Sequence, residues 1–133
     1  EYVWEALNVL RVSRVDHGNH SLDDPELVKE LVERQMPLTV CPLSNLKLKV
    51  IDDLKNHPLK DMMKMGLNVT INSDDPAYFG GYVSDNYEAI ATALDLSEED
   101  ILQLAKNSFK SSFLSLEEKQ KFLDKIEKFY ESR

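Results

Sequence analysis

Apolar residues follow two kinds of pattern along this chain, and the two kinds alternate. Dense apolar positions between residues 2 and 10 predict a well-buried helix or the tail of one. Short β-branched runs predict strands at about 11–16, 38–41 and 68–73. Helical spacing predicts helices at about 25–35 and 59–65, and C-terminal helices at about 84–131. Because nearly continuous apolar strands alternate with helices, the pattern predicts an α/β fold with parallel strands.

Local signals place several helix ends. Asp24, followed by Pro25, is typical of a helix start, and Gly66 is typical of a helix stop. Ser97 and Ser115 each precede an acidic residue three positions later, which predicts two capping boxes. An apolar stripe in the last helix is expected to pack in the core, and it consists of Phe122, Leu123, Ile126, Phe129 and Tyr130.

Composition narrows the class of protein. The 133 residues suit one domain, and 42% apolar with 30% charged residues indicates a globular chain. A net charge of −8 argues against a nucleic-acid binder, and no apolar run has the length of a membrane span. Cys41 is the only cysteine, so no internal disulfide can form, which favours a reducing, cytoplasmic location.

Three parallel strands leave both sheet edges open to pairing, which favours self-association. The chain also begins at Glu1 without an initiator methionine. We therefore expect that it is part of a longer protein whose other strands would cover these edges.

Each predicted strand ends in residues that can carry chemistry. His17 follows the first strand, Ser44 and Asn45 follow the second, and Asp74 and Asp75 follow the third. Ligands of parallel α/β folds gather at the carboxyl ends of strands. His17 suits metal ligation, acid–base work or charge stabilisation, while the two aspartates suit a metal or the donor groups of a substrate.

Simpler interpretations of the same residues stay open. An Asp-Asp-Pro turn is more often a helix cap or a solvated turn, and a histidine after a strand is more often a surface residue. His20 and His57 are expected to be exposed, and Cys41 to be a small buried strand residue. From the residues alone, an α/β fold with an acidic metal site is one hypothesis among these.

Four ordered motifs resemble the C-terminal part of the adenosine/adenine deaminase family. They are "RVDHG", "PLTVCPLSN", "HPLKDMM" and "GLNVTINSDDPAYFGGY". His17 and Asp74 lie 57 positions apart, which is similar to the family's separation of its catalytic histidine from its last metal ligand. "SDDPAYFGGY" after "CPLSNLKL" resembles the adenine deaminase branch more closely.

The resemblance implies a zinc-dependent (β/α)₈ barrel of the TIM type that hydrolyses the exocyclic amine of a purine base or nucleoside. Residues 1–133 would then be the last three βα units of one barrel domain. Carried over by position, Asp74 matches the aspartate that ligates zinc, and Asp75 matches the neighbour that hydrogen-bonds the purine ring. His17 matches the histidine that aids attack by the zinc-activated water.

The chain departs from the family pattern in one large respect. The paired H-x-H ligands are absent, since His17 and His20 are three apart, and the other ligand and the acid–base glutamate are expected upstream of Glu1. We therefore expect the chain alone to bind Zn²⁺ weakly or not at all and to be inactive. The alternatives are an adenosine deaminase and a non-catalytic barrel remnant that acts as an interaction or folding module.

Overall fold

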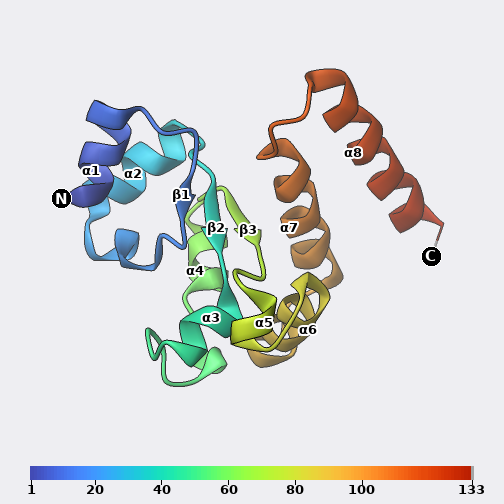
Figure 1. The fold of residues 1–133 in the computed structure, drawn as a ribbon. Coiled ribbons are helices and arrows are strands. Elements are labelled where there is room, and N and C mark those ends of the chain that lie inside the picture. The colour runs from blue at the N-terminus through green and yellow to red at the C-terminus, as the bar shows by residue number, and fades with distance from the viewer. Residues whose placement is uncertain (133) are drawn as a thin grey trace.

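A three-stranded parallel sheet forms the centre of the molecule (Figure 1). The computed structural model describes residues 1–132. The strands β1 (Val15–Asp16), β2 (Leu38–Val40) and β3 (Val69–Ile71) lie in the order β1-β2-β3. In the register, Leu38 of β2 stands between Val15 of β1 and Val69 of β3. The prediction of an α/β fold with parallel strands is confirmed, and the sheet is open rather than closed into a barrel.

Helices connect and cover the strands. The α-helices are α1 (Tyr2–Glu5), α2 (Pro25–Glu33), α3 (Pro42–Lys47), α4 (Leu59–Lys64), α5 (Pro76–Phe79), α6 (Val83–Leu94), α7 (Glu98–Lys110) and α8 (Leu116–Glu131). Shorter turns are a π-helical segment η1 (Ala6–Leu10) and the 3₁₀ segments η2 (Asn19–Asp23) and η3 (Leu54–Asn56). The sequence did not predict α3 and α5, because each is short and begins with a proline that also suits a turn.

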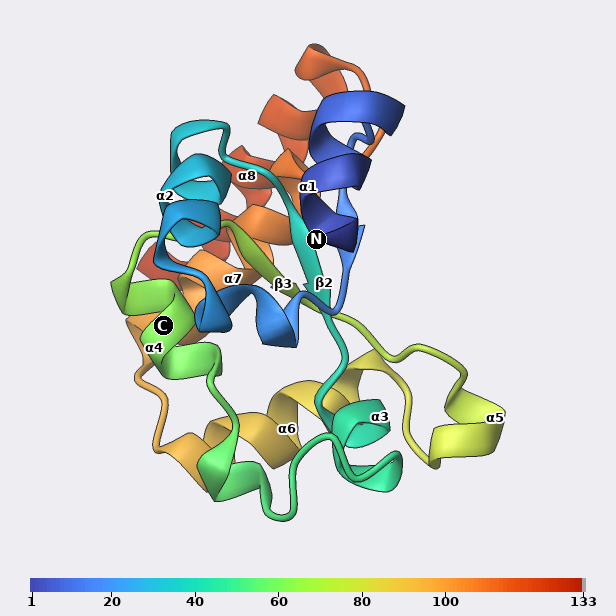
Figure 2. The same cartoon turned by 90° about the vertical axis from the view of Figure 1, so that its left-hand side faces the viewer.

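The apolar core lies on one face of the sheet. Leu38, Val40, Val69 and Ile71 share that face in the register and belong to the core, whereas Asp16, Thr39 and Thr70 point to the other face. Figure 2 shows α1 and α2 in front of the strands and α7 and α8 behind them. All residues of β2 and β3 are buried. Their apolar partners from the helices are Leu31, Leu59, Met62, Ile90 and Leu104, none of which is exposed to solvent.

Capping side chains fix the helix starts that the sequence predicted. The carboxylate of Asp24 accepts hydrogen bonds from the backbone N–H groups of Glu26 and Leu27. It also accepts one from the indole of Trp4 at 2.9 Å, so the same residue joins α1 to α2. Capping boxes open α7 at Ser97 and α8 at Ser115, as predicted.

Two expectations about apolar segments were wrong. Within residues 2–10 only Leu7 is buried, and Tyr2, Val9 and Leu10 are exposed. The segment ends in a π-helical turn at Arg11, which has a φ of 52°. The stripe on α8 is not core either, since α8 has no buried residue and Phe129 is 69% exposed. Instead Phe122 stacks on Phe109, so the stripe faces α7 at the surface.

Truncation of a core residue on α7 tests this account of the packing. We expect Leu104→Ala to lower the free energy of unfolding by about 2–5 kcal/mol, because it leaves a cavity against β3. The matched control Leu116→Ala, at a side chain that is 85% exposed, should change it by less than about 0.5 kcal/mol. Urea unfolding followed by circular dichroism measures both, and equal losses would contradict the assignment of the core.

Candidate functional site

The structure brings His17 and Asp74 together at the carboxyl ends of the strands. Nε2 of His17 lies 3.7 Å from Oδ2 of Asp74, although the residues are far apart in sequence. Both have left-handed backbone conformations, with φ of 60° and 57°, which are uncommon outside glycine. The chain therefore turns sharply after β1 and after β3, and the two turns set these side chains against each other. Their side chains stay 38% and 31% exposed, so a ligand can reach them.

The start of α3 supports both residues from behind. Ser44, which is fully buried, donates a hydrogen bond of 2.7 Å from Oγ to Oδ2 of Asp74. The amide of the neighbouring Asn45 lies 3.3 Å from Nδ1 of His17. Ser44 and Asn45 hold the carboxylate and the imidazole of the site.

Asp75 begins a helix. Its Oδ1 accepts hydrogen bonds from the backbone N–H groups of Ala77 and Tyr78 at 3.1 and 3.2 Å, which makes it the N-cap of α5. The helix-cap interpretation of the Asp-Asp-Pro turn thus describes Asp75, while Asp74 turns toward His17. A role of Asp75 in binding a purine stays a prediction.

Cys41 lies beside this pair. One donor atom from each of His17, Cys41 and Asp74 falls within 4.8 Å of the others. Within residues 1–132 this is the one group of three such side chains with metal-ligand spacing. Burial, together with the nearby carboxylates of Asp74 and Asp16, raises the pKa of the Cys41 thiol to about 12. Carboxylate oxygen is a donor that Zn²⁺ accepts, so Asp74 can supply one ligand to a metal centre at the strand ends.

His57 is buried, contrary to expectation. It lies just before α4, and only 4% of the residue is exposed. Burial lowers the pKa of His57 to about 4, so the ring is neutral near pH 7. Nδ1 accepts a hydrogen bond from the backbone N–H of Leu59, and Nε2 lies 3.0 Å from the amide of Asn45. His20 is exposed as predicted and pairs with Asp23 on the surface. No periodic signal separated these two histidines in the sequence.

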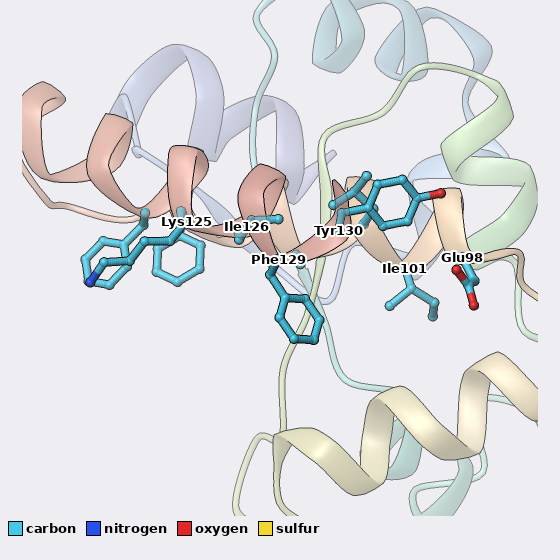
Figure 3. Close-up of a pocket in the computed structure, with 10 residues that line it drawn as sticks. Glu98, Ile101, Lys125, Ile126, Phe129 and Tyr130 are labelled. Carbon is cyan, nitrogen blue, oxygen red and sulfur yellow. The ribbon is translucent and has the colours of Figure 1, made fainter. Parts of the chain in front are cut away.

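An apolar pocket lies between α7 and α8, away from the strand ends. Figure 3 shows Ile101 of α7 with Ile126 and Phe129 of α8 around an apolar space of about 380 Å³. Its lining is almost entirely apolar and aromatic, with charged groups from Glu98 and Lys125 alone. The polar groups that could hold a metal or act on a substrate converge at the strand ends instead.

The family model described as "Adenosine deaminase" matches residues 1–129, nearly the whole chain. The chain belongs to the adenosine deaminase family. Among curated members, an adenine deaminase from Acinetobacter baylyi is 56% identical over 126 residues, which are 95% of this chain and 38% of that protein. One from Sphingopyxis alaskensis is 59% identical over 129 residues, which are 97% of this chain and 38% of that protein.

Two solved structures share the fold of this chain. An adenine deaminase from Arthrobacter aurescens superposes with a TM-score of 0.95 at 49% identity, covering 98% of this chain and 40% of that one. An amidohydrolase from Burkholderia ambifaria, with bound Zn, gives a TM-score of 0.82 at 26% identity and covers 98% of this chain and 39% of that one. The open sheet therefore corresponds to part of a deaminase barrel, as the sequence predicted.

The chain spans about two fifths of the length of the relatives it matches. Among the helices of residues 1–132, none combines the length and apolarity that a membrane crossing requires.

The reactivity of Cys41 tests the electrostatics of the site. Because its pKa is raised to about 12, little thiolate exists near pH 8, and we expect the folded chain to react with a thiol reagent at least about 100-fold more slowly than the unfolded chain. The rate for the folded chain should keep rising as the pH passes the ordinary thiol value of 9.0. Colorimetric titration with and without denaturant measures both rates. A plateau near that ordinary value in the folded chain would contradict the assignment.

Proposed function

We propose that residues 1–133 supply three βα units, and part of the active site, of an adenine deaminase that converts adenine and water to hypoxanthine and ammonia. The observation that carries the proposal is the meeting of His17 with Asp74 at 3.7 Å, at the strand ends where α/β enzymes place their chemistry. Relatives named adenine deaminase, at 56% and 59% identity, support adenine as the substrate.

Asp74 is proposed as the metal ligand that this chain contributes. Ser44 donates to Oδ2 of Asp74, and this hydrogen bond fixes the carboxylate so that its oxygens face the end of the sheet. The solved relative with bound Zn supports zinc as the metal. Zinc, when bound, supplies Lewis-acid chemistry and lowers the pKa of water toward neutrality. Since structural and catalytic zinc sites use three or four protein ligands, we expect the chain alone to hold the ion weakly.

His17 is proposed as the catalytic residue beside the metal. Its exposed ring faces the same space as Asp74, where it can orient water and stabilise charge that develops as the purine carbon is attacked. Asp75 is proposed to bind the purine ring. Because Oδ1 of Asp75 is used in capping α5, its second carboxylate oxygen is the one that faces a donor group of the base.

One observation favours a second substrate. The matching family model carries the description "Adenosine deaminase", so adenosine is the alternative to adenine.

With either substrate, we propose that the reaction takes place in a reducing, cytoplasmic compartment, which the single buried cysteine supports.

Substitution at the two central residues separates their roles. In a full-length protein that carries these residues, Asp74→Asn should remove both bound zinc and activity, because it takes away a charged ligand. His17→Gln should keep zinc and lower kcat on adenine by at least about 100-fold. His20→Gln is the matched control, since that histidine is exposed and lies outside the site. Metal analysis and ammonia release from adenine and from adenosine measure these effects.

Two outcomes would contradict the proposal. Equal rates on adenine and adenosine would remove the assignment of the substrate. Full activity of His17→Gln would remove the role of the histidine.

A further inference from the structure

A buried row of polar side chains lies directly behind His17. Asn45 is 1% exposed and His57 is 4% exposed. In the structure Nδ2 of Asn45 lies 3.0 Å from Nε2 of His57, and Oδ1 of Asn45 lies 3.3 Å from Nδ1 of His17. The amide thus connects the two imidazole rings. In such a row each hydrogen bond decides the direction of the next, because every contact needs one donor and one acceptor.

The backbone fixes the direction of the first hydrogen bond in this row. The N–H of Leu59 points at Nδ1 of His57 at 3.1 Å, and a backbone N–H can only donate. Nδ1 of His57 must therefore carry no proton, and the neutral ring carries its proton on Nε2. The lowered pKa of the buried ring agrees with this neutral form.

The direction of the hydrogen bond between His57 and Asn45 follows from the first one. Because Nε2 of His57 is a donor, it cannot pair with Nδ2 of Asn45, which the structure places opposite it. The Asn45 amide must therefore be turned over, so that its carbonyl oxygen Oδ1 faces His57. The amide group, Nδ2, then faces His17. An amide turned over about its last bond occupies nearly the same space, so contacts rather than shape decide between its two orientations. In the structure Nδ2 of Asn45 donates to Oδ1 of Asn19 at 3.2 Å. With the Asn45 amide turned over, the Asn19 amide must turn over as well, so that its Nδ2 donates to Oδ1 of Asn45.

The last hydrogen bond of the row joins Asn45 to His17. With Nδ2 of Asn45 donating to Nδ1 of His17, that nitrogen is an acceptor, and the neutral ring carries its proton on Nε2. Nε2 is the atom that faces Oδ2 of Asp74.

We propose that His57 and Asn45 are positioning residues that hold His17 in the tautomer with its proton on Nε2. In this tautomer Nε2 has no lone pair to give to a metal, so His17 presents an N–H to the site although its ring has ligand spacing with Asp74 and Cys41. The tautomer stands on the contacts alone, whereas its use in catalysis rests on the proposed function.

Nitrogen-15 NMR of the 133-residue chain tests the tautomer directly. The chain has three histidines, and His20→Gln identifies the exposed one and serves as the control variant. Long-range ¹H–¹⁵N spectra recorded at about pH 8, above the ordinary pKa of histidine, distinguish protonated from unprotonated ring nitrogens. We expect the proton on Nε2 in both His17 and His57. A proton on Nδ1 of His17, or shifts that average the two tautomers, would overturn the proposal.

Two variants test the link between the rings. Asn45→Asp replaces the donating amide by a carboxylate that only accepts, so the His17 proton should move to Nδ1. His57→Leu removes the donor that orients Asn45, so the His17 signals should become an average of both tautomers, and His57→Gln, whose amide can donate to Asn45, should restore the proton to Nε2. Unchanged His17 signals in His57→Leu would overturn the proposal even if the buried charge of Asn45→Asp prevents folding.

Kinetics of a full-length protein with these residues keep this inference separate from the proposed function. We expect His57→Leu to lower kcat about tenfold or more with little change in KM, and His57→Gln to recover most of the loss. A protein that deaminates adenine with the His17 proton on Nδ1 would refute the tautomer and leave the function standing. The expected tautomer in a protein that does not act on adenine would refute the function and leave the tautomer standing.

Discussion

Parallel pairing of β1, β2 and β3 brings three carboxyl ends to one edge of the sheet, and the site depends on this constraint. His17, Ser44 and Asp74 leave the sheet from three different strands and still meet within hydrogen-bonding or ion-pairing distance. A change of register by one residue would turn each strand's side chains to the opposite face and separate the three residues. The buried apolar residues of β2 and β3 hold this register because Leu38, Val40, Val69 and Ile71 share one face and pack together in the core.

The polar groups below the site carry a cost that packing must offset. His17 and Asp74 adopt left-handed backbone conformations, and Ser44, Asn45 and His57 are buried polar side chains. Buried polar groups are costly unless each finds a partner. Here each of them has one: Ser44 bonds to Asp74, and Asn45 lies between His17 and His57. The same contacts that satisfy these groups fix the orientation of the two residues that reach solvent.

The sequence predicted the order of strands and helices because apolar periodicity and capping residues are local signals. It also located the strand ends, and the family motifs then selected His17, Asp74 and Asp75 among the polar residues there. It could not predict the burial of His57, because burial depends on where α4 packs and not on the residues next to His57 in the sequence. It overestimated the burial of the first ten residues and of α8, since apolar content alone does not say which surface an element meets.

The central claim is that Asp74 binds the metal while His17 faces it without binding it. X-ray diffraction at the zinc absorption edge, on crystals of a full-length protein that carries these residues, tests this claim most directly. The account predicts an anomalous peak about 2.0–2.2 Å from a carboxylate oxygen of Asp74. It also predicts that Nε2 of His17 and the sulfur of Cys41 lie outside bonding distance of that peak. Zinc bonded to His17 or Cys41, or no zinc beside Asp74, would contradict the account.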